Sequence, residues 1–159
     1  MTKIPFVEGA ILLVDKPLNW TSFDVVKKIR YEIINHFKIK KIKVGHAGTL
    51  DPLATGLIVL CTGKKTKTIT ELIIDSKFYE GEIRLGATTP SFDLETEIDK
   101  EFALPSVDDN TLKNIEEKFT GEINQLPPLF SAKRVKGKRA YEYARNNEYV
   151  ELKPNLISI

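Results

Sequence analysis

The sequence at residues 45–61 reads GHAGTLDPLATG followed directly by LIVLC. Its first part, residues 45–56, is rich in glycine and small residues, which suit a backbone that turns tightly or lies close to another group. Asp51 precedes Pro52, and this position biases the aspartate away from the right-handed helical region. The apolar run at residues 57–61 predicts a buried strand. The stretch therefore predicts a polar loop held against a strand, where rigid scaffolds commonly present reactive side chains.

Asp51 and His46 are the two side chains of this loop that carry acid–base chemistry, and each also has a structural interpretation. An Asp-Pro pair often begins a helix, with the aspartate as N-cap and the proline in the first turn. A carboxylate at a helix start is favoured in its ionised form, which is also the form that a nucleophile needs. A lone histidine among glycines is commonly a turn residue. The sequence leaves both interpretations open for each residue.

The composition is that of an ordinary globular chain of one domain. Of its 159 residues, 42% are hydrophobic and 29% are charged, and the formal net charge is +2. This charge neither requires nor excludes a nucleic acid partner, because the distribution of charge matters more than its sum. Cys61 is the single cysteine, and with only two histidines the sequence has no zinc motif. We expect no metal, no membrane segment and a cytoplasmic location.

Hydrophobic periodicity predicts strands and helices along the whole chain. A helix is expected from Thr21 or Ser22 to about Phe37, and Thr21 with Asp24 matches a capping box that has aspartate in place of glutamate. The other expected elements are a strand at 9–14, a helix at 66–74, a strand at 77–86, a long loop at 87–101, helices at 109–119 and 140–146, and a strand within 150–159.

The loop sequence GHAGTLDPLATG resembles the signature of the TruB family of tRNA pseudouridine synthases. Residues 16–24, 77–86 and 125–145 are similar to further motifs of that family, in the same order and spacing. The resemblance implies a reaction without metal or cofactor, in which the bond between uracil N1 and ribose C1′ breaks and the base is rejoined through C5. The base must first leave its stack, because an enzyme cannot otherwise reach it.

The resemblance also implies a role for each matching residue. Asp51 is the nucleophile, and Tyr79 stacks on the flipped uracil and is suited to take part in removing the C5 proton. His46 lies beside the RNA loop and supports the flipped arrangement. Contacts to phosphates and the RNA backbone are implied for four lysines, namely Lys16, Lys77, Lys133 and Lys136.

Three basic clusters, at residues 38–43, 64–67 and 133–139, have two interpretations. They are either solvated surface or contacts for phosphates. A nucleophilic carboxylate repels anionic RNA, so cations have to surround Asp51 if the resemblance holds. We therefore expect the three clusters to lie around it.

The implied fold is α+β, a mixed and mostly antiparallel sheet with helices packed on its faces. The implied partner is the T-arm of tRNA, with the T-loop uridine at position 55 in tRNA numbering as target and a monomeric full-length protein. Residues 1–159 are expected to be an incomplete catalytic domain. The family's later part carries an arginine that pairs with the catalytic aspartate, and often a small C-terminal RNA-binding domain, and the sequence shows neither. Two alternatives remain: a truncated, non-catalytic module that binds the T-arm, and a scaffold in which Asp51 only caps a helix.

Overall fold

The computed structural model describes residues 4–73, 76–104, 106–131, 133–146 and 148–159. The chain forms two compact units, which divide between Glu80 and Gly81. All strand pairings among the described residues are antiparallel, and helices accompany them, so the α+β class is confirmed. The described strands form four small sheets rather than the single sheet that the sequence predicts.

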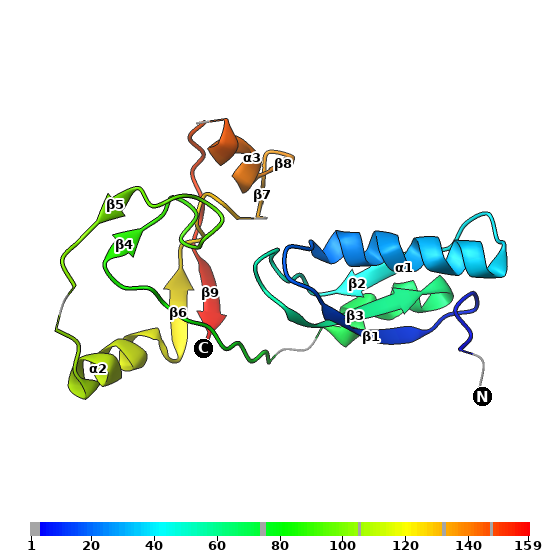
Figure 1. The fold of residues 1–159 in the computed structure, drawn as a ribbon, viewed down its shortest axis with the longest axis horizontal. Coiled ribbons are helices and arrows are strands. Elements are labelled where there is room, and N and C mark those ends of the chain that lie inside the picture. The colour runs from blue at the N-terminus through cyan, green and yellow to red at the C-terminus, as the bar shows by residue number, and fades with distance from the viewer. Residues whose placement is uncertain (1–3, 74–75, 105, 132, 147) are drawn as a thin grey trace. The chain divides into compact units, whose positions relative to one another are not determined.

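The first unit is a three-stranded sheet with a long helix on one face (Figure 1). The strands lie in the order β1-β3-β2, and a 3₁₀ helix follows β3. The helix and the strand at 57–61 are confirmed, whereas β2 was not predicted. The helix expected at 66–74 is the 3₁₀ helix, and its last predicted residue lies outside the described residues. The bounds are β1 (Ile11–Lys16), α1 (Ser22–Phe37), β2 (Val44–Ala47), β3 (Gly56–Thr62) and η1 (Gly63–Leu72).

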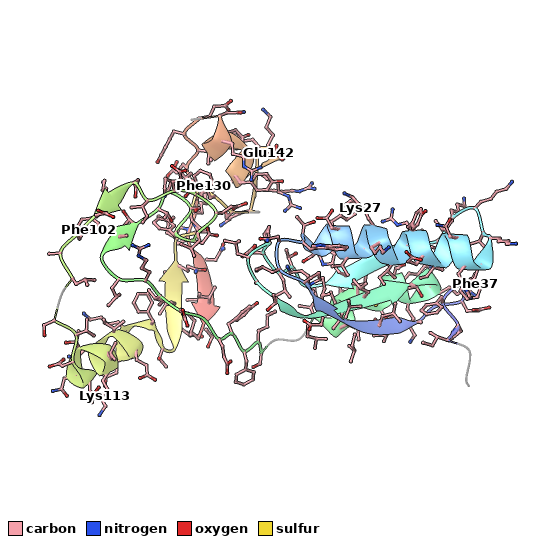
Figure 2. The ribbon with its side chains drawn as sticks, in the orientation of Figure 1. Lys27, Phe37, Phe102, Lys113, Phe130 and Glu142 are labelled. Atoms are coloured by element: carbon pink, nitrogen blue, oxygen red, sulfur yellow. The ribbon has the colours of Figure 1, made fainter. Side chains whose placement is uncertain are left out.

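The core of the first unit lies between α1 and the sheet. Val25 and Val26 of the helix pack against Ile58 and Leu60 of β3, and all four side chains are buried. Removing side chains of this size from water stabilises a fold by about 1.5–3 kcal/mol each. The outward side of the helix is polar, and Figure 2 shows Lys27 pointing away from the sheet. The buried contacts between α1 and β3 thus hold the sheet and its connecting loops in place.

Helix α1 begins where the sequence predicts because of its capping box. The backbone N–H of Asp24 donates to the Thr21 hydroxyl at 3.1 Å, and the Thr21 N–H donates to the Asp24 carboxylate at 3.1 Å. Hydrogen bonds from Thr21 hold the pKa of Asp24 below its ordinary value. This reciprocal pair satisfies two donors that a helix start otherwise leaves without partners.

The described residues of the second unit form two helices and three two-stranded ribbons, in which β4 pairs with β5, β6 with β9 and β7 with β8. The helices at 109–119 and 140–146 are confirmed within one residue at their ends. The terminal strand is shorter than predicted, and it pairs with β6, which was not predicted. The bounds are β4 (Ala87–Thr88), β5 (Lys100–Glu101), α2 (Asp109–Phe119), β6 (Glu122–Gln125), β7 (Arg134–Val135), β8 (Lys138–Arg139), α3 (Ala140–Arg145) and β9 (Asn155–Ser158).

The strand predicted at 77–86 is wrong. Residues 76–85 have no regular structure, and no described strand pairs with them. Tyr79 is 68% exposed and Ile83 is 88% exposed, so the apolar face of the alternating pattern is not buried. Strand propensity reflects packing against cross-strand neighbours more than an intrinsic backbone preference. The alternation alone therefore overpredicts a strand here.

Candidate functional site

Residues 48–55 form the loop between β2 and β3, and they include Asp51. Gly48 and Gly56 stand at its two ends with φ angles of +93° and +120°, which favour glycine. The N–H of Ala54 donates to the carbonyl oxygen of Asp51 at 3.0 Å, which closes a turn, and the chain enters β3 two residues later. Since no helix follows Asp51, its interpretation as a helix N-cap is wrong.

The residue before Asp51 is held by Ser22, the first residue of α1. The Ser22 hydroxyl donates to the carbonyl oxygen of Leu50 at 3.0 Å and accepts from the Leu50 N–H at 2.9 Å. Ser22 is only 3% exposed, so these bonds are shielded from solvent. Both polar groups of the Leu50 backbone are thereby anchored to the start of the helix.

The residue after Asp51 is held from the segment that joins β1 to α1. The N–H of Asn19 donates to the carbonyl oxygen of Pro52 at 2.8 Å. The ammonium group of Lys16 donates to the carbonyl oxygen of Trp20 at 2.6 Å and lies 3.5 Å from that of Pro52. The loop is therefore fixed on both sides of Asp51 by residues 16–22.

Lys16 itself is placed differently from the phosphate contact implied by the sequence. Its side chain is fully buried, and its ammonium group also donates to the carbonyl oxygen of Pro17 at 3.0 Å. A lysine whose donors all point at backbone carbonyls inside the protein has none to offer a phosphate. The geometry gives Lys16 a role in holding the loop instead.

The Asp51 carboxylate is exposed, in contrast to the anchored backbone on either side of it. Among the described residues, it makes no hydrogen bond and no ion pair. Its position is thus defined by the backbone rather than by side-chain partners, and its oxygens are accessible to a molecule from solvent.

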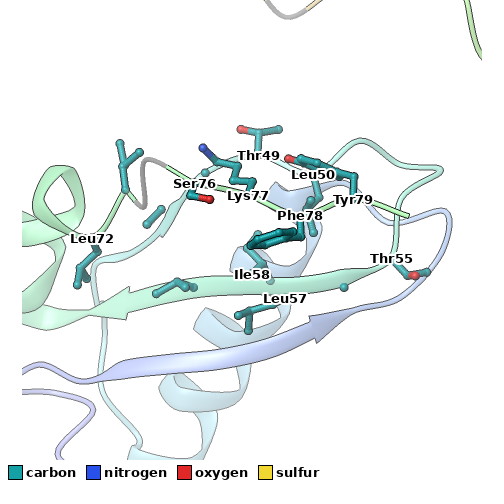
Figure 3. A pocket seen from close by; sticks show the side chains of 15 residues that line it. Thr49, Leu50, Thr55, Leu57, Ile58, Leu72, Ser76, Lys77, Phe78 and Tyr79 are labelled. Carbon is teal, nitrogen blue, oxygen red and sulfur yellow. The ribbon is translucent and has the colours of Figure 1, made fainter. Parts of the chain in front are cut away.

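A pocket of about 280 Å³ lies beside this loop (Figure 3). Its lining comes from loop residues 48–50, from β3 residues 56–59 and from residues 76–79, with further residues at 47, 55, 72 and 73. Asp51 does not line it, although Leu50 does. Most of the lining is apolar, with a few polar side chains, as is typical of small-molecule sites.

Lys77 and Tyr79 both line this pocket, so the structure brings them together with the loop. Figure 3 shows both side chains close to the labelled loop residues Thr49 and Leu50. Tyr79 is 68% exposed, which leaves its ring accessible for stacking. His46 is half-buried in β2 opposite Leu60, and its Nδ1 atom contacts the carbonyl oxygen of Gly48, where the loop begins.

Lys133 and Lys136 belong to the second unit. The ammonium group of Lys133 donates to the carbonyl oxygen of Lys153 at 2.6 Å and to the side-chain oxygen of Asn155 at 2.9 Å, which ties it to the start of β9. Lys136 lies exposed in the turn between β7 and β8. It makes no hydrogen bond or ion pair with the described part of the chain, so its charge is available to a ligand.

The basic cluster at residues 38–43, and Lys64 of the cluster at 64–67, do not lie around Asp51. The N–H of Gly63 donates to the carbonyl oxygen of Lys43 at 2.9 Å, and Val44 pairs with Thr62 at the end of the sheet away from the loop. The length of β3, at about 3.3 Å per residue, separates that end from the loop by about 20 Å. The expectation is therefore wrong for residues 38–43 and for Lys64. The reason is that β2 and β3 form a hairpin. The residues before β2 and those after β3 therefore lie together at the end of the hairpin that is away from its loop.

Comparison with known proteins identifies the family. The profile of the TruB family pseudouridylate synthase, N-terminal domain, matches residues 35–159. The chain belongs to the TruB family. The resemblance read from the loop sequence is thus confirmed.

Several relatives of this TruB-family chain are named tRNA pseudouridine synthase B. The chain is 54% identical to that of Phocaeicola vulgatus, over 97% of the chain and 66% of the relative. It is 49% identical to that of Flavobacterium johnsoniae, over 100% of the chain and 70% of the relative. It is 51% identical to that of Chlorobaculum tepidum, over 91% of the chain and 59% of the relative. The chain spans about two thirds of the length of the curated relatives it matches.

Two further observations concern only the part of the TruB-family chain that the structure describes. None of its helices combines the length and the apolar character needed to cross a membrane. No three or more of its His, Cys, Asp and Glu side chains come together as a metal site.

The sequence did not identify Ser22 and Asn19 as part of the site. Both lie in a segment that resembles a family motif, yet nothing in the local pattern signals a partner in a loop about thirty residues away, because sequence periodicity reports only neighbours along the chain. Only the fold shows that residues 16–22 support the loop at 48–55.

Proposed function

We propose that this chain carries the nucleophile and the base-binding pocket of a tRNA pseudouridine synthase that acts on the T-loop uridine at position 55. The observation that carries the proposal is the exposed carboxylate of Asp51, which has no side-chain partner among the described residues, on a loop whose flanking residues are both fixed. The family and the names of its relatives support the reaction class. A pocket beside the loop supports binding of a single extruded base.

In the proposed reaction, the Asp51 carboxylate attacks the target nucleoside once the base has left its stack. The carboxylate forms a covalent bond to the nucleoside, and the bond between N1 and C1′ breaks. After the base has turned, C5 bonds to C1′ and the bond to Asp51 breaks, which regenerates the carboxylate. C5 then loses its proton and N1 gains one. Uridine and pseudouridine are isomers, so no atom is gained or lost overall. Tyr79 stacks on the base and takes part in removing the C5 proton, and His46 supports the flipped nucleotide.

Binding of the RNA depends on cations that contact phosphates, because these contacts position RNA without reading its sequence. Lys77, beside the pocket, and Lys136, in the exposed turn, are the proposed contacts. Affinity for a T-arm RNA is therefore expected to fall linearly with the logarithm of the salt concentration. A flat salt response contradicts this arrangement.

A second candidate is a module that holds the T-arm without isomerising the uridine. The observation that favours it is the lack, among the described residues, of a cation paired with the Asp51 carboxylate. An opposite charge stabilises the ionised form of a nucleophile and the charges that develop during its attack. Without that charge, the same pocket binds a base but does not turn it over.

The experiment that separates these functions measures tritium release from T-arm RNA labelled at uracil C5. It compares the 159-residue chain and the complete natural gene product, each as wild type and as Asp51→Asn. For the synthase, we expect Asp51→Asn to lower the release rate by at least about 1000-fold, as is typical for loss of a nucleophile. Asp15→Asn is a matched control, since Asp15 is an exposed carboxylate at the same end of the sheet, opposite Leu57.

Release that survives in Asp51→Asn contradicts the role of this residue. Binding of the RNA by both wild-type proteins without any release supports the binding module. Absence of both binding and release rejects both functions and leaves a scaffold.

A further inference from the structure

The hydroxyl of Ser22 makes two hydrogen bonds to one residue, Leu50, which lies 28 positions further along the chain. A hydroxyl has a single proton, so it donates to the Leu50 carbonyl while its lone pair accepts from the Leu50 N–H. Both bonds are therefore made at once and neither competes with the other. Leu50 immediately precedes the proposed nucleophile.

We propose that Ser22 is a positioning residue for the reaction, which acts on the Asp51 carboxylate through the Leu50 backbone. This inference rests on the proposed function. The carbonyl group of Leu50 and the N–H of Asp51 belong to one planar peptide unit. A hydrogen bond that fixes the Leu50 carbonyl therefore also fixes the orientation of the Asp51 N–H.

The backbone on the C-terminal side of Asp51 is restrained as well. The carbonyl oxygen of Pro52 is held by the Asn19 N–H at 2.8 Å, and the proline ring fixes its own φ angle. Between these anchors, the backbone of Asp51 has little freedom, and its carboxylate has no side-chain partner in the described part of the chain. Loss of the Ser22 hydroxyl releases one of the two anchors and leaves both Leu50 groups without their buried partner.

A purely structural role makes a different prediction, and the first unit contains the matched case. The fully buried Thr62 hydroxyl donates to the carbonyl oxygen of Phe6 at 2.6 Å and accepts from the N–H of Ala10 at 3.0 Å. This is the same pair of bonds to backbone groups, made at the end of the sheet away from the loop. Loss of either hydroxyl is expected to lower stability, but only loss of the Ser22 hydroxyl acts on turnover.

The test uses the complete natural gene product with Ser22→Ala, Ser22→Thr, Ser22→Cys and Thr62→Val. Single-turnover rate and Kd are measured with T-arm RNA, at a temperature at which circular dichroism shows each variant folded. Ser22→Ala is expected to slow the single-turnover rate by about 10- to 100-fold, as for a misplaced reacting group, with Kd changed less than about 3-fold. Ser22→Thr keeps the hydroxyl and is expected to restore most of the rate. Ser22→Cys keeps the unbranched shape of the side chain, with a somewhat larger atom that is only a weak donor and acceptor, and its rate is expected to resemble that of Ser22→Ala.

Thr62→Val is expected to lower the Tm about as much as Ser22→Ala while its turnover stays near that of wild type. Equal slowing by Ser22→Ala and Thr62→Val overturns the inference, because the effect then follows stability alone. Wild-type turnover in Ser22→Ala also overturns it, and the proposed function then still stands. A wild-type protein without turnover instead contradicts the proposed function. If Ser22→Thr does not fold, Ser22→Cys against Thr62→Val decides the outcome.

Discussion

Val26 of α1 and Leu112 of α2 are both apolar residues within capped amphipathic helices, yet Val26 is 1% exposed and Leu112 is 55% exposed. In the first unit the helix packs on a sheet whose inner side chains are buried. Among the described residues of the second unit, the buried hydrophobic side chains are those of Ala140 and Val150. The first unit therefore has a core of its own, whereas α2 presents its apolar residues to solvent.

The two helices begin in similar ways. In α2 the Asp108 carboxylate accepts from the Thr111 N–H at 2.8 Å, as the Thr21 hydroxyl accepts from Asp24 in α1. The capping sequence thus fixes where each helix begins, while packing fixes how strongly it is held. The loop with Asp51 is attached to the well-packed unit, which suits a side chain that must keep one position.

The largest expected effect tests the difference in packing. Leu60→Ala is expected to destabilise the first unit by about 2–5 kcal/mol, because it leaves a cavity under α1. Leu112→Ala in α2 is expected to change stability by no more than about 0.5 kcal/mol, as is typical of a surface substitution. Urea unfolding with amide hydrogen exchange measures each unit separately. Similar losses for both variants contradict the comparison.

A second prediction concerns the buried lysine of the loop support. Lys16→Met is expected to lower the stability of the first unit by about 1–3 kcal/mol, because the carbonyl of Trp20 loses its buried donor. Lys64→Met is the control, since Lys64 is exposed at the opposite end of the same sheet. Chemical denaturation measures both variants. An unchanged midpoint for Lys16→Met shows that its ammonium group does not hold the loop.

A third prediction separates two lysines of the second unit that the sequence did not distinguish. Lys136→Ala is expected to weaken T-arm binding and to reduce the salt slope by about 1, as for one phosphate contact, without a loss of stability. Lys133→Ala is expected to lower stability by about 1 kcal/mol, because its bonds to Lys153 and Asn155 are internal. Kd measured across a salt series, together with Tm, distinguishes the two roles.

The smallest expected effect is a dependence on pH that the two helices share. Hydrogen bonds from Thr21 lower the pKa of Asp24, and those from Thr111 lower the pKa of Asp108, each relative to 3.8. A carboxyl group whose pKa is lower in the folded protein stabilises the fold at pH values above 3.8. This stability is lost as the pH falls through the pKa of the group in the folded protein. Thermal unfolding between pH 5 and pH 2 is expected to show this loss, and Asp24→Asn with Asp108→Asn is expected to reduce it.

The elements that could be predicted from sequence are those with local signals. The capping box and the periodicity of α1, the apolar run of β3 and the pattern of α2 are all read from residues close together in the chain. The segment at 77–86 has the alternating pattern of a strand but no partner strand among the described residues, so the strand predicted from that pattern is not formed.

The same distinction applies to the site. The local loop sequence left Asp51 open between a helix N-cap and a nucleophile, and the resemblance of the whole loop to the TruB signature made it the candidate nucleophile. The position of the lysines at 38–43 depends on the reversal of chain direction between β2 and β3. The support from Ser22 and Lys16 depends on contacts between segments that are distant in the sequence. These features follow from the fold and not from a pattern.

The antiparallel pairing of β1 with β3 also has a consequence for how the protein is made. Ile11 pairs with Cys61, so the ribosome adds roughly fifty more residues before the first strand can find its neighbour, a high sequence separation of the kind that slows folding. Until then the nascent chain exposes the unpaired apolar segment Ile-Leu-Leu-Val, and exposed segments of this kind are prone to aggregate. The loop at residues 48–55 is synthesised between the two strands, so its support from residues 16–22 also depends on this long-range pairing.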